Sequence, residues 1–353
     1  MTTSLQKRFC SGLTRAIWPA LAAAGLGLAV VLLSGGNPAD VLFALAHGAF
    51  GSPSNIATTL ARTTPLLLTG LSVALAFRAG LFNIGGEGQL LAGALAAAWM
   101  GTQEWALSGI IFLPLVLFVS MAAGFLWGLA PGWLKARRGV HEVISTIMMN
   151  HIAIQLADYL INGPLRAGAY VARTEALAPE ARIPVLWHVA PSGVSWGLVV
   201  ALALCVAGAW FLFRTAGGYE LRAVGLGPEA ARTCGIPVHR VTALSMGLAG
   251  GLAGLAGGIE VGGVHHTLYA QFSSGHGFDG IAVALLARNH PLGVVPAALL
   301  FGALRTADRW LQLSAGVPQD LVLIIQAFAI LAVGLQGGLV KLGGRRTAPV
   351  VGS

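Results

Sequence analysis

Four polar side chains with strong hydrogen-bonding capacity interrupt apolar stretches of this sequence. Asn83, Glu87 and Gln89 follow one another at spacings of four and two residues, and if this segment is helical the first two share a helix face. Asn150 lies in the middle of a second apolar segment. A carboxylate and amides beside a polar cavity could hydrogen-bond a ribose or the edge of a nucleobase. The alternative is structural: they satisfy backbone groups at a helix break, pair with Arg78 or join neighbouring helices.

Other reactive side chains do not form a recognisable site. The sequence contains no G-x-x-x-x-G-K-[ST] phosphate loop and no H-E-x-x-H zinc motif. The histidines of one glycine-rich segment are His265, His266 and His276. Their H-H-x9-H spacing matches no metal-ligand pattern, so we expect solvated side chains and no metal site. The three cysteines also lack metal-ligand spacing, and we expect no disulfide. Because no catalytic motif is recognised, we expect a non-enzymatic chain without a cofactor of its own.

The elements that carry these polar residues are predicted to be membrane helices. Only 10% of the 353 residues are charged, against about 25% in soluble domains, and 56% are hydrophobic. The long stretches without Asp, Glu, Lys or Arg are 16–39, 105–134, 183–213, 241–259 and 321–340. Uncharged apolar stretches of this length are typical of membrane-spanning helices. The net charge of +8 forms no basic stripe, so we expect no nucleic-acid partner.

We predict an all-α polytopic membrane protein with about ten transmembrane helices, some of them broken or short. The predicted spans are 16–34, 59–77, 82–101, 106–132, 142–162, 193–213, 241–260, 279–288, 291–309 and 318–337. Segment 279–288 is too short to cross a bilayer alone, and 81–89 is too polar to face lipid. Broken helices of this kind line the substrate path of transporters. The alternative places both segments at helix ends near the membrane interface.

Basic residues indicate the orientation of the predicted helices. Most of the 21 Lys and Arg residues fall on one side, which we take as the cytoplasm, so both termini are predicted to lie inside. The apolar run near the N-terminus is too long for a cleaved signal peptide, and we expect a retained first helix. The predicted parts are a cytoplasmic tail (1–15), one transmembrane domain (16–340) with a long outer loop (163–192) and a cytoplasmic loop (214–240), and a second cytoplasmic tail (341–353).

One predicted span carries glycines at a regular interval. Gly250, Gly254 and Gly258 repeat every four residues. They therefore lie on one helix face, where the missing side chains let another helix approach closely. The spacing predicts tight helix packing and leaves the partner helix open.

The cytoplasmic loop contains a short helix with its own start and stop signals. Pro228 suits the first helical position, Glu229 the positive end of the helix dipole, and Gly235 the position after the last turn. A helix of two turns buries little by itself, so we expect a protein partner to cover it. The alternative is a solvated linker.

Several segments resemble one known family. The sequence E-A-A-x-x-x-G at 229–235 resembles the loop through which permeases of bacterial ATP-binding-cassette (ABC) importers contact their ATPase subunits. AFRAGLFNIGGEGQ at 76–89 and EVISTIMMN at 142–150 are similar to stretches characteristic of permeases for nucleosides and simple sugars. The outer loop, 163–192, resembles that of the longer of two paired permeases in nucleoside importers. The resemblance covers roughly 60–340 and indicates the nucleoside and simple-sugar (branched-chain amino acid and ribose-type) permease family.

This resemblance implies a type II-like ABC importer permease in the bacterial cytoplasmic membrane that moves nucleosides or simple sugars inward. It implies three protein partners: a cytosolic ATPase that binds ATP and Mg²⁺, a second homologous permease, and an extracytoplasmic substrate-binding protein. The residues implied to form the ATPase-docking coupling helix are Pro228, Glu229, Ala230, Ala231 and Gly235. The family often has Asn where this chain has Gly227, which changes the helix cap and leaves the docking residues in place.

An ion- or proton-coupled secondary transporter that acts without an ATPase is the alternative function. Glu87, Glu260 and Asp279 could relay protons in such a carrier. The well-delimited helix at 228–235 argues against it, because a self-sufficient carrier needs no docking element.

Overall fold

The computed structural model describes residues 37–315 except 104, 106, 169 and 273–274. The predicted spans 16–34 and 318–337, both predicted tails and both ends of the predicted transmembrane domain lie outside the described residues. The described residues divide into two compact units, one formed by 37–51 with 304–315 and the other by 52–303.

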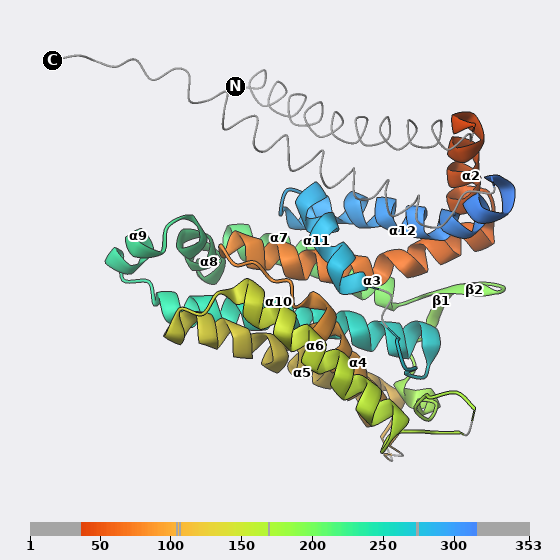
Figure 1. Ribbon diagram of the computed structural model, residues 1–353, viewed down its shortest axis with the longest axis horizontal. Coiled ribbons are helices and arrows are strands. Elements are labelled where there is room, and N and C mark those ends of the chain that lie inside the picture. The colour runs from red at the N-terminus through yellow and green to blue at the C-terminus, as the bar shows by residue number, and fades with distance from the viewer. Residues whose placement is uncertain (1–36, 104, 106, 169, 273–274, 316–353) are drawn as a thin grey trace. The chain divides into compact units, whose positions relative to one another are not determined.

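Helices make up nearly all of the described structure (Figure 1). They are α2 (Pro38–Phe50), α3 (Pro53–Arg78), α4 (Gly86–Gly101), α5 (Gly109–Arg138), α6 (Glu142–Asn162), α7 (Gly197–Arg214), α8 (Ala216–Leu226), α9 (Pro228–Thr233), α10 (Val238–Glu260), α11 (His276–Leu286) and α12 (Pro291–Ala315). A short antiparallel hairpin, β1 (Val185–Val189) and β2 (Ser192–Ser195), precedes α7. The predicted all-α fold class is confirmed.

Among the residues that the structure describes, four helices have the length and apolar composition needed to cross a membrane. They are α3, α5, α7, and α10 with the π-helical turn Val261–His265 that extends it. Helix α11 has 11 residues, about 16 Å of helix, so it is too short to cross a bilayer alone, as predicted for 279–288. The chain is a multi-pass membrane protein. The described helices that correspond to the predicted spans between 59 and 309 are α3, α4, α5, α6, α7, α10, α11 and α12.

The structure corrects three of the predicted elements. Residues 81–85 are not helical, so the predicted span 82–101 is shortened to α4. The side-chain Oδ1 of Asn83 accepts a hydrogen bond from the backbone N–H of Gly85 at 3.1 Å, which satisfies this group without a helix. Helix α2 was not predicted, and the hairpin lies partly within the predicted outer loop. The predicted cytoplasmic loop is largely helical, because it contains α8 as well as α9.

Helices α4, α5 and α10 pack side by side through glycines and form the centre of the larger unit (Figure 1). A Cβ atom on Gly254 would lie 2.7 Å from the Cα of Gly124 in α5, and one on Gly93 of α4 would meet the backbone of Gly254. Gly250 also faces Gly124, and a Cβ on Gly258 would meet the hydroxyl of Ser120. The partner helices that the sequence left open are therefore α5 and α4.

The smaller unit contains α2 and the C-terminal part of α12 among the described residues. The His47 ring of α2 contacts the Trp310 ring of α12 edge-on, with centroids 4.9 Å apart. Gly48 lies against the same helix, where a Cβ would be 2.9 Å from the Cα of Ala307. Ring contact and close backbone approach thus hold these two helices together.

Candidate functional site

Two polar residues of the 81–89 segment, Asn83 and Gln89, form a closed hydrogen-bonded pair. The amides of Asn83 and Gln89 bond to each other in both directions: Asn83 Nδ2 donates to Gln89 Oε1 at 2.9 Å and Gln89 Nε2 donates to Asn83 Oδ1 at 3.0 Å. Because 83 precedes α4, Asn83 and Glu87 do not share a helix face, which corrects that expectation. The paired amides instead join the non-helical segment to the first turn of α4.

Glu87 connects the starts of two helices. Its Oε2 accepts a hydrogen bond from the backbone N–H of Gly277 at 2.8 Å, and the residue is 4% exposed. Gly277 lies in the first turn of α11, and Glu87 lies in the first turn of α4. A carboxylate at these N-termini satisfies an unpaired N–H and stabilises both helix dipoles. Arg78 has other partners, since its Nε donates to the carbonyl of Asn289 at 2.8 Å.

Asn150 connects α6 to the non-helical segment 81–85 and to the start of α4. Its Nδ2 donates to the carbonyl of Ile84 at 2.9 Å, and its Oδ1 accepts from the N–H of Gly88 at 2.8 Å. All four side chains of the predicted substrate pathway, Asn83, Glu87, Gln89 and Asn150, are at most 4% exposed. The structure brings them together around the break and occupies them with each other and with the backbone. Their contact with a solute stays a prediction.

Ser120 is a second buried polar contact, and the sequence reasoning missed it. Its hydroxyl lies within hydrogen-bond distance of two carbonyl oxygens, of Gly93 in α4 at 2.9 Å and of Gly254 in α10 at 2.7 Å. The signal that could have found it is the spacing Ser120, Gly124, Gly128, which puts small residues on one face of α5.

The predicted coupling helix is present as α9. Gly227 is its N-cap, Pro228 occupies the first turn, and Gly235 has the left-handed φ of +80° that ends the helix. Glu229 is 81% exposed at its side chain and pairs with Arg232 at 3.0 Å. Ala231, at 4% exposed, packs into a cluster that includes residues of α8 and α10. Helix α9 is thus anchored on one side and presents charged groups on the other.

Helix α8 lies between α9 and the end of α3, which leads into the non-helical segment 81–85. Gly225 lies directly against the backbone of Arg78, Ala79 and Gly80, so that any Cβ atom there would overlap the carbonyl of Arg78. Gly80 has a φ of +72° and begins the turn that leads into 81–85. A series of contacts, through side chains between α9 and α8 and through backbone between α8 and residues 78–80, therefore leads to the non-helical segment 81–85.

The histidine segment is only partly as predicted. His265 is exposed, and its Nε2 lies 3.4 Å from Glu260 Oε1. His276 is 8% exposed in the first turn of α11, so the expectation of a solvated loop histidine is wrong there. Across the residues that the structure describes, no group of three His, Cys, Asp or Glu side chains could hold a metal ion.

A G-x-S-x-G sequence at 193–197, which the sequence reasoning overlooked, forms no nucleophile site of the hydrolase type. Ser195 ends β2 of the hairpin, 6% exposed, and its Oγ packs against Gly197 and Gly263. In a hydrolase this motif lies on a sharp turn between a strand and a helix that exposes the serine. Ser195 also lies between a strand and a helix, but it is buried rather than exposed.

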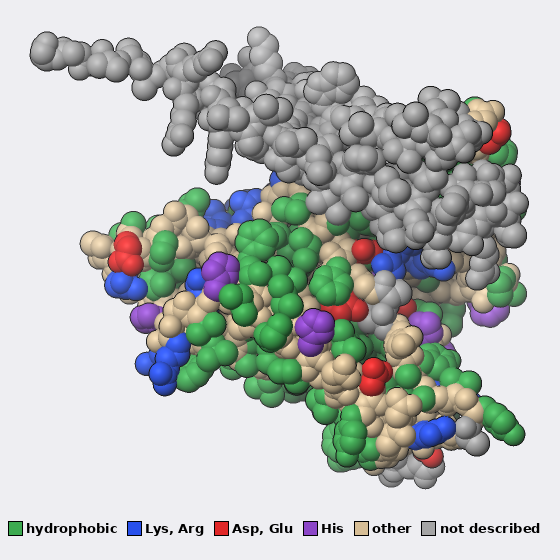
Figure 2. Space-filling view, in the orientation of Figure 1, with side chains coloured by type: hydrophobic (Ala, Val, Ile, Leu, Met, Phe, Trp, Pro, Cys, Tyr) green, Lys and Arg blue, Asp and Glu red, His purple; other side chains and the backbone are tan. Residues whose placement is uncertain are grey.

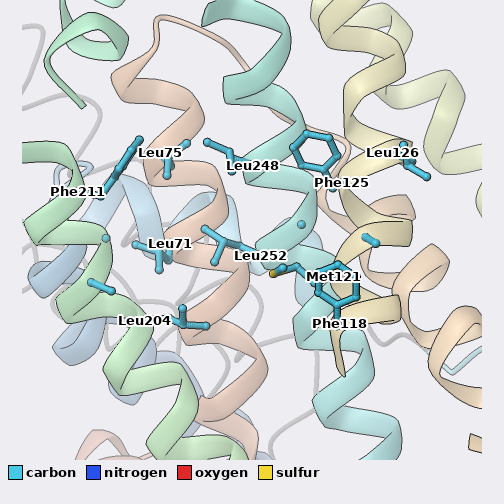
Figure 3. A pocket seen from close by; sticks show the side chains of 14 residues that line it. Leu71, Leu75, Phe118, Met121, Phe125, Leu126, Leu204, Phe211, Leu248 and Leu252 are labelled. Atoms are coloured by element: carbon cyan, nitrogen blue, oxygen red, sulfur yellow. The ribbon is translucent and has the colours of Figure 1, made fainter. Parts of the chain in front are cut away.

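One hollow among the described helices is apolar (Figure 3). It has a volume of about 490 Å³ and lies between α3, α5, α7 and α10, with Leu71, Phe118, Phe211 and Leu252 among its lining residues. The lining consists of hydrophobic side chains and glycine. Sites for polar ligands need a few converging polar groups, so this hollow suits hydrocarbon rather than a polar solute.

Comparisons with known proteins match this chain to permease components of transport systems. Residues 55–334 match the model of a family described as branched-chain amino acid transport system, permease component. The guanosine ABC transporter permease protein NupP of Bacillus subtilis is 42% identical over 87% of this chain and 88% of its own length. The glucose ABC transporter permease protein TsgB13 of Haloferax volcanii is 35% identical over 88% of this chain and 84% of its own length.

A third similar protein comes from the same organism as the first. The guanosine ABC transporter permease protein NupQ of Bacillus subtilis is 29% identical over 70% of this chain and 79% of its own length. One bacterium thus has two different guanosine permeases that both resemble this chain.

Proposed function

Because the chain belongs to the family of branched-chain amino acid transport system permease components, we propose that it is the membrane-spanning subunit of an ABC importer that moves nucleosides into the cytoplasm. The 42% identity to a guanosine permease favours nucleosides, and the 35% identity to a glucose permease makes simple sugars the nearest other class. The observation that carries the proposal is the exposed, delimited helix α9 on a multi-pass permease scaffold.

Helix α9 is the docking element for a cytosolic ATPase in this proposal. It exposes Glu229 and Arg232 while Ala231 holds it against α8 and α10. A partner that covers α9 would contact Pro228, Glu229 and Ala230, all of which are exposed. The ATPase then binds ATP and Mg²⁺, and α9 of this chain is the surface that the ATPase displaces when its conformation changes.

The remaining partners follow from the same assignment. A second, homologous permease is supported by the two guanosine permeases of one organism that both resemble this chain. An extracytoplasmic binding protein delivers the nucleoside to the outer ends of the helices. The complex resides in the bacterial cytoplasmic membrane with both termini of this chain inside, as the distribution of basic residues indicates.

The contacts suggest how ATPase motion reaches the transmembrane helices. A displacement of α9 moves α8, with which it shares an apolar cluster. Gly225 of α8 transmits the displacement to the backbone at Arg78–Gly80, next to the non-helical 81–85 segment. The network of Asn83, Gln89 and Asn150 then moves α4 and α6 together.

A secondary transporter is less well supported. Of the three carboxylates considered for proton relay, Glu87 is held by the backbone of α11. Such a carrier would also leave the docking surface of α9 without a role.

Uptake measurements separate the two functions. We expect cells that express the complete importer to accumulate radiolabelled guanosine, to lose uptake when the ATPase is inactivated, and to retain it initially when an uncoupler collapses the proton gradient. Excess unlabelled nucleoside should compete, and excess glucose should not. Uptake that survives loss of the ATPase and stops with the uncoupler would establish the secondary transporter instead.

A further inference from the structure

One face of α6 exposes polar side chains at the middle of the helix. We define the exposed face of α6 by the exposed residues between 144 and 159, which are Ile144, Met148, His151, Ile152, Gln155, Leu156 and Tyr159. The helix has 21 residues, about 31 Å, which matches the roughly 30 Å hydrocarbon core of a bilayer. His151 and Gln155 are one turn apart and near its centre, so they lie at membrane depth.

The hydrocarbon core of a bilayer is an unfavourable environment for His151 and Gln155. Polar and ionisable side chains in membrane helices almost always face other protein or a water-filled cavity, because hydrocarbon offers no hydrogen-bond partner. Consistent with this, α6 is not among the four described helices whose length and apolar composition alone suit membrane crossing. Figure 2 shows hydrophobic side chains over the visible surface of α5 and α6, with histidine among them.

The comparison with α7 shows what a lipid-compatible face looks like in this protein. Val206 and Trp210 lie one turn apart on α7 and are 61% and 63% exposed, similar to Ile152 at 53% and Tyr159 at 69% on α6. Both of these α7 side chains, Val206 and Trp210, are largely apolar. On α6 the exposed residues near the helix centre also include His151 and Gln155, so the exposed faces of the two helices differ in polarity there.

The polar groups of α6 also differ from the network on its other side. Asn150 is occupied by the backbone of Ile84 and Gly88. Within the part of the chain that the structure describes, the side chains of His151 and Gln155 form no hydrogen bond. They are therefore available to bind a solute, whereas Asn150 would first have to break two buried contacts.

We propose that the exposed face of α6 lines the path of the nucleoside through the importer and that His151 and Gln155 hydrogen-bond the nucleoside in transit. This inference rests on the proposed function and assigns residues to it. A neutral imidazole and a carboxamide each offer a donor and an acceptor, which matches the base edge and the ribose hydroxyls. Met148 and Tyr159 lie one turn beyond on either side and can pack against the faces of the base.

Water access and nucleoside protection test the proposal in the assembled importer. Single cysteines are introduced as His151→Cys or Gln155→Cys after the three native cysteines are replaced by alanine, and a charged methanethiosulfonate reagent is applied to inverted membrane vesicles. Only a thiol in water ionises and reacts readily. We expect both cysteines to react and saturating guanosine to slow each reaction at least fivefold.

Two control variants calibrate the labelling. Val206→Cys on α7, where Val206 is 61% exposed, should stay unreactive in lipid. Ala153→Cys lies on the buried face of α6, where Ala153 is 1% exposed, and should react only if the protein unfolds. Cysteines at 151 and 155 that react no faster than the one at 206 would overturn the proposal. Reaction without protection by guanosine would also overturn it, because the face would be wet but not in contact with the solute.

Transport kinetics provide a readout that does not depend on cysteine. His151→Ala and Gln155→Ala should each raise the KM for guanosine about five- to tenfold, the effect of one lost hydrogen bond, with ATPase binding unchanged. Val206→Ala should leave KM as in the wild type. Wild-type uptake that depends on ATP, combined with unaltered KM in both α6 variants, would leave the proposed function standing and this inference refuted.

Discussion

At the scale of single residues, buried hydrogen bonds decide what the polar side chains do. Asn83, Gln89 and Asn150 look in the sequence like groups that bind a solute, because nothing in a linear spacing shows whether a neighbour satisfies them. In the structure each is bonded to side chain or backbone at 2.8–3.0 Å. Leaving a buried donor or acceptor without a partner costs about 1–3 kcal/mol, so such contacts are retained.

Loss of the Asn150 amide should therefore affect stability before it affects substrate recognition. Asn150→Leu leaves the N–H of Gly88 and the carbonyl of Ile84 unpaired in the interior. We expect a loss of about 2–4 kcal/mol and a fall in the thermal midpoint of the detergent-solubilised protein of roughly 5 °C or more.

Asn162→Leu is the matched control, because Asn162 lies exposed at the end of the same helix and bonds only to the carbonyl of Asp158. It should leave the thermal midpoint unchanged. An Asn150→Leu protein that keeps its midpoint and loses only affinity for nucleoside would show that Asn150 belongs to the substrate pathway.

At the scale of elements, the sequence predicted most of the helices and the short length of α11, because long uncharged stretches and glycine spacing are local signals. The sequence-based prediction was wrong where tertiary contacts determine whether a segment is helical. The 81–85 segment stays non-helical because Asn83 bonds to Gly85 and Gln89. Helix α8 was missed because its glycines lower helix propensity, and it exists because Gly218 and Gly225 fit against α7 and the end of α3.

The packing of α10 provides a test at this scale. Gly254→Ala places a methyl group 2.7 Å from the Cα of Gly124, where only backbone could move away. We expect the three helices α4, α5 and α10 to separate locally, with a marked loss of folded protein recovered in mild detergent. Fluorescence size-exclusion chromatography measures this directly.

Gly251→Ala makes the same chemical change on the same helix at a tolerant site. Its Cβ would lie 3.4 Å from the flexible side chain of Met121, so the variant should be recovered like the wild type. If Gly254→Ala and Gly251→Ala behaved alike, close glycine packing would not be what holds these helices together.

At the scale of the whole molecule, the contacts connect the docking helix to the break near Asn83. Gly225→Ala should disturb this connection, because its methyl group would overlap the carbonyl of Arg78. We expect the variant to bind the ATPase, since α9 is unchanged, and to lose most nucleoside uptake. Co-purification and uptake of radiolabelled guanosine measure the two properties separately.

Gly217→Ala on the same helix is the control, since its Cβ would meet only the ring of Phe211 at 3.4 Å. It should transport like the wild type. Normal uptake by Gly225→Ala would mean that motion reaches the membrane helices by another route.

The central claim is that α9 docks an ATPase, and co-purification tests it most directly. The tagged importer is isolated in mild detergent as wild type, Glu229→Arg and the control Glu175→Arg, which makes the same charge change at an exposed position between α6 and α7. We predict that the wild type and the control recover an ATPase and a second permease, and that Glu229→Arg loses only the ATPase. A wild-type protein that is isolated alone and still transports nucleoside after reconstitution would contradict the account.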